Sequence, residues 1–333
     1  MPETRPSAVS TAARPKTGSR LTAGEAVFVA LAVFVIVAPW IAPYDPGRQF
    51  AGYPYAPPMR PHVVDAGGTL HAPFGYPLRL VDPIERRYEE DRTRRATFAA
   101  GDPWFLLGSD ALGRDVLSRV LTGARLSLGV ALLSTLFALS IGALAGAAAG
   151  YGRGWIDALV MRVADVVIVL PAIYLVLALR GVLPIHLSDL QVFSALVLVL
   201  TVIGWPNAAR GVRGIVLVER EAEYAEAARA LGASAWRVIL RHLVPATRGF
   251  LVVQTTVLVP AFIMAEATLS FVGLGFATPT PSWGAMLGDV AAVQVAAESP
   301  WLLAPAAAIV IAVFVVHTAG TSRDPLLWGR RDI

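Results

Sequence analysis

Long apolar runs, separated by shorter polar segments, occupy most of this chain. Six of them approach the length of about 20 residues that a helix needs to cross a bilayer. They cover residues 24–43, 126–150, 166–183, 189–205, 249–274 and 301–320. A backbone surrounded by lipid has to satisfy its own hydrogen bonds, so each run is expected to be a helix. The pattern therefore predicts an all-α, polytopic membrane protein with six transmembrane helices.

Proline bears on two of these runs. Pro171 lies inside the third run, where we expect it to kink a helix that has a lead-in from Ile156. The first run follows a basic stretch within residues 1–20, which also fits a signal peptide. The small residues near its end are followed by Pro39 and Pro43, which argues against cleavage.

Arginine and lysine are concentrated in alternate connecting segments, and this asymmetry predicts an orientation. Segments 184–188 and 275–300 contain neither residue type, whereas basic residues mark the two ends and segments 151–165 and 207–248. Both termini are therefore expected in the cytoplasm. The arginine-rich segment 44–125 must then lie outside, which is tolerable because long segments translocate largely regardless of charge.

These features divide the chain into five expected parts. They are a cytoplasmic tail, a first transmembrane helix, an extracytoplasmic insert with a pre-core segment, a five-helix core and a second cytoplasmic tail. Their boundaries are 1–23, 24–43, 44–125, 126–320 and 321–333.

The insert is expected to be a packed cap that carries no chemistry. Its first part is rich in Pro, Gly and Tyr and is interpreted as an ordered loop. The charged run 87–98 is expected to be solvated, with a short helix as one alternative. His62 and His71 lie too far apart in a loop to indicate a metal site.

Composition supports lipid as the solvent. Of the 333 residues, 56% are hydrophobic and 16% are charged, with a mean hydropathy of +0.60. A soluble domain has roughly a quarter of its residues charged. The net charge of +4 is compatible with nucleic-acid binding, but the arginines lie mainly at the ends of apolar runs.

Several classes of chemistry are excluded. The absence of cysteine excludes disulfides, thiolate metal sites and a cysteine nucleophile. The one lysine, Lys16, follows proline, so no phosphate-binding loop of the GxxxxGK[ST] type is present, and nucleotide energy would have to come through another chain. The sequence contains neither an HExxH nor a GxSxG motif, either of which would indicate an enzyme. Few ionisable residues occur in the spans, which argues against a secondary transporter that works alone.

A polar, amphipathic stretch interrupts the apolar pattern at residues 219–245. From Glu219 to Leu231 the residues favour a helix, on which we expect one apolar stripe. Gly232 should end this helix in a left-handed conformation. The expected stripe consists of Tyr224, Ala227, Ala228 and Leu231.

A second short helix should follow. Ser234 is a natural N-cap, and Pro245 should stop the helix before the fifth apolar run. Its expected apolar face consists of Trp236, Ile239, Leu240 and Leu243. Physical argument leaves two interpretations equally open: a hairpin that rests at the membrane interface, and a docking element for a soluble partner. A DNA-binding helix-turn-helix is disfavoured, because the flanking spans tether the hairpin to the bilayer.

The residues EAARALG at 226–232, followed by LVP at 243–245, resemble the coupling motif of binding-protein-dependent ABC importer permeases. Glu226, Ala227, Ala228, Gly232 and Pro245 match that motif. His242 and Val244 depart from its general form, although RHLVP is similar to the dipeptide/oligopeptide branch. Segments 41–46, 107–128, 150–171 and 265–287 resemble the same branch.

The resemblance implies a type I importer permease fold in a bacterial inner membrane. The implied partners are a homologous second permease, two cytoplasmic ABC ATPases that hydrolyse ATP and an extracytoplasmic solute-binding protein. The resemblance implies no catalytic residue, cofactor or metal in this chain, and no nucleic acid. Peptides are the expected solute; nickel, glutathione and glycan importers use similar permeases.

The resemblance also implies roles in the hairpin. Glu226 would contact the ATPase and Gly232 would provide the bend. Tyr224, Ala228 and Leu231 would pack, and the arginines Arg229, Arg237 and Arg241 would form ion pairs.

Three further groups of residues outside the hairpin are singled out. Glu266 is a carboxyl group at membrane depth, so it is expected either to make structural hydrogen bonds or to line the translocation path. The motif at 107–119 is expected to form a structural network before the second span, with gating or binding-protein contact as the alternative. Asp165 is expected to pair with Arg162. The motif residues are Gly108, Asp110, Gly113, Arg114, Asp115, Ser118 and Arg119.

Overall fold

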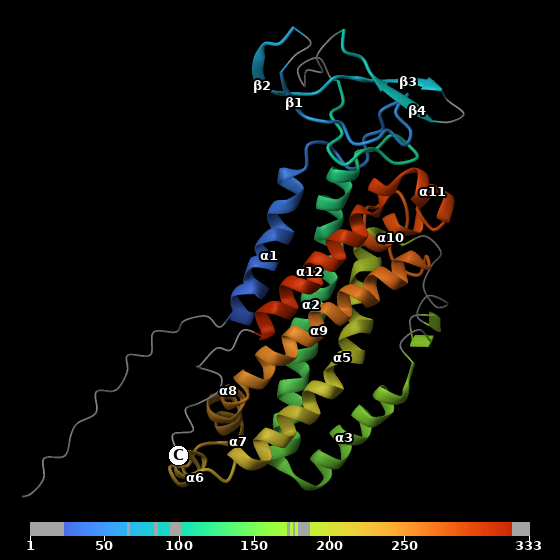
Figure 1. Cartoon of the computed structure of the whole chain (residues 1–333). Coiled ribbons are helices and arrows are strands. Elements are labelled where there is room, and N and C mark those ends of the chain that lie inside the picture. The colour runs from blue at the N-terminus through green and yellow to red at the C-terminus, as the bar shows by residue number, and fades with distance from the viewer. Residues whose placement is uncertain are drawn as a thin grey trace, which may run out of the picture.

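The computed structural model describes residues 23–64, 67–82, 86–93, 102–171, 174–175, 177–178 and 187–321. These residues form a bundle of long helices, which carries β-strands at one end and the short helices α6 and α7 at the other (Figure 1). We call the end that carries the strands the insert end, and the end that carries helices α6 and α7 the hairpin end. The two predicted tails, 1–23 and 321–333, lie almost entirely outside the described residues.

Four of the six predicted spans are confirmed as helices that are long and apolar enough to cross a membrane. They are α2 (Val116–Gly152), α5 (Asp189–Glu219), α9 (Arg248–Phe271) and the stretch Pro300–Thr318, which joins η3 (Pro300–Leu303) to α12 (Ala304–Thr321). The first span corresponds to α1 (Ala23–Ile41), whose described apolar part is shorter. The third begins with α3 (Gly154–Val169), and most of its second half lies outside the described residues.

Two expectations about these helices are corrected. Helix α2 begins at Val116, ten residues before the apolar run at 126, because Asp115 caps a helix whose first turns mix apolar residues with the buried Ser118 and Arg119. Pro171 ends α3 and does not kink it: Leu170 is extended, with φ −73° and ψ 119°. The proline ring disfavours the α conformation of the preceding residue, which explains this ending.

Helices α2 and α5 pack closely along the centre of the bundle. Gly142, Gly146 and Gly150 recur every fourth residue on the face of α2 that meets α5. A Cβ at Gly146 would overlap the backbone of Ala209, so the two helices approach where side chains are smallest. Small residues allow such contacts between membrane helices, where hydrophobic attraction between the helices is absent.

The insert contains two β-hairpins, where we expected a loop and a solvated charged run. Strand β1 (His62–Val64) pairs with β2 (Leu70–Phe74), and β3 (Leu78–Asp82) pairs with β4 (Arg87–Glu90). In β4 the side chains alternate, so Tyr88 faces inward and its hydroxyl donates to the carbonyl of Pro54 at 2.7 Å. Pairing with β3 decided that residues 87–90 form a strand. The local charge pattern of these residues does not predict this pairing.

Candidate functional site

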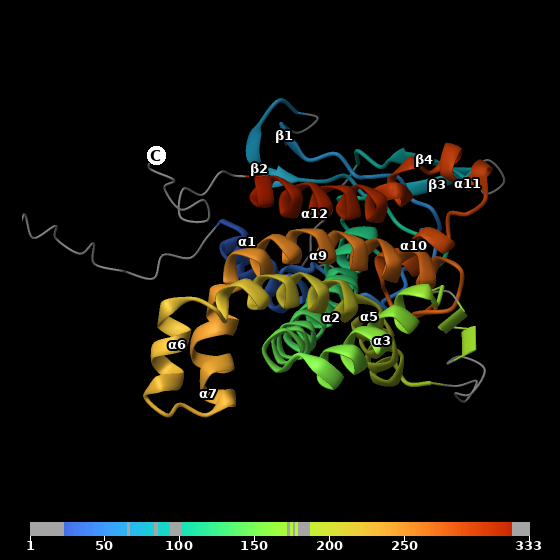
Figure 2. The ribbon, with the colours of Figure 1, turned by 90° about the horizontal axis from the view of Figure 1, so that it is seen from below.

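The amphipathic stretch forms two short helices beside the bundle (Figures 1 and 2). Helix α5 ends at Glu219, a turn comes next, and α6 covers Glu223–Ala230, so the expected continuous helix from Glu219 is interrupted. Gly232 has a φ of +79°, and the amide of Ala233 donates to the carbonyl of Ala228 at 3.0 Å. The predicted left-handed ending at Gly232 is therefore confirmed.

The second arm of the hairpin is continuous with the next span. It consists of α7 (Ala235–Val238), the π-helix η2 (Ile239–Leu243) and α8 (Val244–Ala246). Ser234 occupies the N-cap position, without a capping hydrogen bond from its side chain. Pro245 does not stop the helix as expected. The wider π turn before it relieves the clash between a proline ring and the carbonyl four residues earlier, so the chain remains helical.

The residues of the predicted apolar stripe lie mainly on the exposed side of α6. Helix α6 buries Ala225 and half-buries Ala228, whereas the side chains of Tyr224 and Leu231 are 40% and 89% exposed. Ala227 is exposed as well. The periodic pattern in the sequence is defined by the largest apolar side chains. The contact of α6 with the ends of α2 and α5 is so close that only small side chains fit there. The hairpin core consists of Ala225, Val238, Ile239 and Leu243, packed against Ala143, Ala147, Val212 and Val216.

The expected apolar face of the second arm is only partly correct. Ile239 and Leu243 are buried, but Trp236 is 59% exposed and Leu240 is 52% exposed. Together with Tyr224 and Leu231 these side chains leave large apolar groups exposed on the surface of the hairpin. We call Tyr224, Leu231, Trp236 and Leu240 the open face.

Charged groups lie among the residues of the open face. The side chain of Glu226 is 62% exposed and lies 3.9 Å from Arg229, which donates a hydrogen bond to the carbonyl of Arg220 at 3.0 Å. Within the described part of the chain, Arg237 and Arg241 form no ion pair, so their expected ion pairs stay a prediction. Glu226 therefore presents a carboxylate that is only weakly engaged by its own chain.

Two contacts secure the base of the hairpin. Arg220 donates to the carbonyls of Gly150 and Tyr151 at 3.3 and 3.0 Å. These carbonyl groups lie in the last turn of α2, where they have no partner within the helix. The hydroxyl of Tyr224 donates to Glu219 at 2.6 Å. Burial, reinforced by the hydrogen bond to Glu219, raises the pKa of Tyr224 to about 12, so this hydroxyl keeps its proton at physiological pH.

At the insert end, the motif residues form the expected buried network. Oδ1 of Asp110 accepts the amides of Leu112 and Arg114 at 2.9 Å, and Oδ2 accepts Nε of Arg114 at 2.6 Å. Arg119, whose side chain is 1% exposed, lies 3.3 Å from the same Oδ2. Asp289 lies 3.9 Å from both arginines. We call Asp110, Arg114, Arg119 and Asp289 the ionic cluster.

The remaining motif residues hold the start of α2. Oδ2 of Asp115 accepts the amide and the hydroxyl of Ser118 at 2.8 and 2.6 Å, and the Ser118 hydroxyl accepts the amide of Tyr44 at 3.0 Å. Gly108 and Gly113 lie in the turns on either side of Asp110, with φ of 70° and 71°. The motif thus joins the exit of α1 to the start of α2.

Sequence reasoning missed Asp289. It lies at the C-cap of α10 (Trp283–Gly288), far from the motif along the chain, and no local pattern pairs it with arginine. Burial raises the pKa of Asp289 above its ordinary value, although Arg119 and Arg114 act in the opposite direction. The expected pair of Asp165 with Arg162 is also corrected, because Asp165 pairs with Arg210 of α5.

Glu266 is completely buried in α9 and supports a loop. Its Oε1 accepts the hydroxyl of Ser270 at 2.7 Å, and the hydroxyls of Ser127 and Ser282 approach the same carboxyl group. Each serine oxygen also accepts a backbone amide at 3.1 Å, from Phe276, Trp283 and Ala285 respectively. This geometry favours the structural alternative for Glu266, since the carboxyl group organises hydroxyls that hold the loop 276–285.

Comparison with known families agrees with these features. Residues 142–322 match the family described as the binding-protein-dependent transport system inner membrane component. Residues 22–58 match the N-terminal transmembrane domain of oligopeptide transport permease C. The first match covers more than half of the 333 residues, so the chain belongs to the family of binding-protein-dependent transport permeases.

Three curated relatives are similar over much of the chain. The glutathione transport system permease protein GsiD of Pectobacterium atrosepticum is 35% identical over 80% of this chain and 87% of its own length. The oligopeptide permease OppC of Bacillus subtilis is 37% identical over 75% and 80%. The dipeptide permease DppC of the same organism is 42% identical over 57% of each. Among solved structures, a chain of the inward-facing MetNI methionine ABC transporter matches with a TM-score of 0.49 and 22% identity, over 63% of this chain and 94% of that one.

Proposed function

We propose that this chain is a permease subunit of an ATP-driven importer for short peptides and forms half of the translocation pathway. A homologous permease would supply the other half, two cytoplasmic ABC ATPases the energy, and an extracytoplasmic protein the solute. In this proposal the protein resides in a bacterial inner membrane with both termini, and the hairpin end, in the cytoplasm. Family membership supports the class of protein, and the names of the relatives support the solute.

The open face of the hairpin is the observation that carries the proposal. Exposed clusters of large apolar side chains mark interaction surfaces, and buried aromatic anchors dominate the energy of such surfaces. Trp236 and Tyr224 provide such anchors beside the exposed carboxylate of Glu226. A hairpin that rests in lipid would separate its apolar and charged faces. Here charged and apolar residues alternate on the exposed side of α6, which favours a protein partner.

Glutathione is the second candidate solute. The relative with the broadest coverage among these three, GsiD, is named for glutathione transport. Glutathione is itself a short peptide, so both candidates share a backbone amide and terminal charged groups. A binding protein that delivers the solute would decide between them.

Reversal of the charge at Glu226 tests the coupling role. In the complete importer reconstituted in vesicles, Glu226→Lys should reduce ATP-dependent peptide uptake by roughly thirtyfold, the effect of losing about 2 kcal/mol at an interface anchor. Thermal unfolding should not change, because Glu226 is exposed. Glu223→Lys is the matched control, since it makes the same charge change one turn away on the same helix. Uptake by Glu226→Lys equal to that of the control would refute the assignment.

A further inference from the structure

Arg220 is a residue at which three helices of the molecule meet. It is the C-cap of α5, and its amide donates to the carbonyl of Val216 in that helix at 3.0 Å. Its own carbonyl accepts a hydrogen bond from Arg229 of α6 at 3.0 Å. Its guanidinium group donates to the carbonyls of Gly150 and Tyr151 at the end of α2. One residue therefore joins α5, the first arm of the hairpin and α2.

The end of α2 is a favourable place for the guanidinium group. The last carbonyls of a helix carry the negative end of the helix dipole, so a cation is stabilised there. The side chain of Arg220 is only 13% exposed, which limits competition from water. Oε1 of Glu221 accepts hydrogen bonds from Nε of Arg220 at 3.0 Å and from Nη2 of Arg153, the C-cap of α2, at 3.3 Å. Glu221 thus helps to orient the side chain of Arg220.

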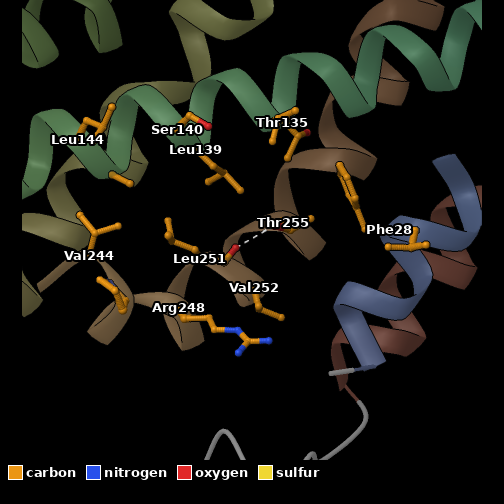
Figure 3. A pocket seen from close by; sticks show the side chains of 14 residues that line it. Phe28, Thr135, Leu139, Ser140, Leu144, Val244, Arg248, Leu251, Val252 and Thr255 are labelled. Atoms are coloured by element: carbon orange, nitrogen blue, oxygen red, sulfur yellow. Dashed lines mark hydrogen bonds between the residues drawn. The ribbon is translucent and has the colours of Figure 1, made fainter. Parts of the chain in front are cut away.

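The apolar contacts between the hairpin and α2 are of a different kind. The hairpin core packs on Ala143 and Ala147 of α2. Beside it, a groove of about 730 Å³ separates α2 from α8 and the start of α9, and Figure 3 shows Leu139 of α2 and Leu251 of α9 on opposite walls. Apolar packing is non-directional, whereas a hydrogen bond restrains both distance and angle. The hydrogen bonds of Arg220 therefore restrain the direction of the contact, which packing alone does not.

Helix α2 extends from this contact to the ionic cluster. It covers 37 residues, or about 55 Å at the rise of an α-helix, and its sequence contains no proline. Arg119 of the ionic cluster lies near its first residue, Val116. Rigid helices of this kind carry a displacement from one end to the other. A movement of α2 at the hairpin end therefore reaches the insert end.

We propose that Arg220 is a positioning residue that transmits movement of the hairpin to α2. This inference rests on the proposed function, since it assigns a route to the movement that the ATPases impose on the hairpin. Arg220 acts through the carbonyls of Gly150 and Tyr151, and it contacts neither the solute nor the ATPase in this assignment. When the hairpin is displaced, the end of α2 moves with it.

The ratio of ATP hydrolysed to peptide taken up tests this route in the complete importer reconstituted in vesicles. Arg220→Gln should raise the ratio about tenfold, as expected when a charge-assisted hydrogen-bonded contact is lost from the route. Arg220→Lys keeps a cation at the helix end without the guanidinium fork, so it should fold and raise the ratio by less, about threefold. Arg213→Gln is the matched control. It removes another partly buried arginine of α5, whose ion pair is with Asp157 of α3.

A purely structural role would lower the unfolding temperature without changing the ratio. A wild-type ratio in both Arg220 variants, or an equal rise in Arg213→Gln, would overturn the inference. Glu226→Lys, measured in parallel, separates this outcome from a failure of the proposed function. If Glu226→Lys loses uptake while both Arg220 variants keep the wild-type ratio, only the route through Arg220 is wrong. If Glu226→Lys and Glu223→Lys take up peptide equally, the proposed function itself fails.

A distance measurement tests the same contact without turnover. The chain has no cysteine, so Glu223→Cys on α6 and Leu133→Cys on α2 accept a pair of spin labels in the complete importer, with any cysteines of the other subunits replaced. The distribution of distances between the labels should broaden roughly twofold in Arg220→Gln, because the hydrogen bonds that restrain the two elements are lost. It should stay narrow in Arg213→Gln. An unchanged width in Arg220→Gln would overturn the inference.

Discussion

The ionic cluster at the insert end and the charged residues of the hairpin differ in their exposure. At the insert end, Arg114 and Arg119 are 4% and 1% exposed and share the carboxylate of Asp110. At the hairpin end, Glu221 is 55% exposed between Arg153 and Arg220, and Glu226 is 62% exposed. Apolar groups show the same contrast, since Phe105 is fully buried in the insert and Leu231 is 89% exposed on the hairpin.

At the insert end, the charged and apolar groups of this comparison find their partners within the chain. On the hairpin, many of the corresponding groups do not. Buried charges require partners, and at the insert end Asp110 and Asp289 provide them within this chain, although the terminal nitrogens of Arg119 make no hydrogen bond among the described residues. The hairpin is fixed at its base by Ala225 and Leu243, and its outer side offers charged and apolar groups to another molecule. The coupling role proposed for the hairpin needs this combination of a fixed base and an exposed contact surface.

The largest expected effect comes from loss of one carboxylate at each end. Asp110→Asn removes the negative charge that compensates two buried arginines, so the free energy of unfolding should fall by about 3–5 kcal/mol. Glu221→Gln removes a carboxylate from an exposed pair and should leave the unfolding temperature unchanged. Thermal unfolding of the solubilised protein measures both. Equal destabilisation by the two variants would abolish the distinction between the ends.

A smaller effect is expected at Glu266, which extends the buried polar structure into α9. Glu266→Ala removes the acceptor of the buried Ser270 hydroxyl and leaves a cavity beside Ser127 and Ser282, so the free energy of unfolding should fall by about 1–3 kcal/mol. Glu266→Gln keeps one acceptor oxygen and should recover part of this loss. Protease cleavage within the loop 276–285 should increase in the alanine variant. If only peptide uptake falls, while stability and cleavage stay at wild-type values, Glu266 lines the pathway instead.

The smallest expected effect concerns the pH dependence at Asp289. Its pKa is raised above the ordinary 3.8 by burial, so the folded protein binds the proton more tightly than the unfolded chain. The free energy of unfolding therefore falls as pH rises through the window that begins near 3.8. The side chain is 38% exposed, and solvent screening limits the contribution to less than about 1 kcal/mol.

Asp289→Asn should flatten this part of the pH profile of thermal unfolding. Asp45→Asn, a substitution of an exposed aspartate in the same end of the molecule, is the control and should retain the wild-type slope. An unchanged slope in Asp289→Asn would show that burial does not raise the pKa of this carboxyl group in solution.

Sequence reasoning recovered the parts of the fold that depend on local pattern. The apolar runs located α2, α5, α9 and α12, and Gly232 marked the bend of the hairpin. It failed at the boundary of α2, because residues 116–125, whose apolar pattern is broken by Ser118, Arg119 and Thr122, already belong to the helix that Asp115 caps. It also failed at residues 87–90, where the paired strand β3 decided the conformation.

For the candidate site, the residues were recognised but their orientation was not. The motif around Glu226 and the acidic and basic residues at 107–119 can be recognised from the sequence alone. The exposure of Tyr224 and Leu231 is not, since it depends on how close α6 comes to α2 and α5. The role of the serines around Glu266 is likewise hidden, because they come from three separate segments.

The sequence by itself determined that the chain is a bundle of apolar helices interrupted by a polar hairpin, because length, apolar content and a single glycine act locally. Only the tertiary structure decided which face of that hairpin is buried and which aspartate completes the ionic cluster. Burial is a property of neighbours that lie far apart in the chain, and small side chains are favoured wherever two helices must approach closely.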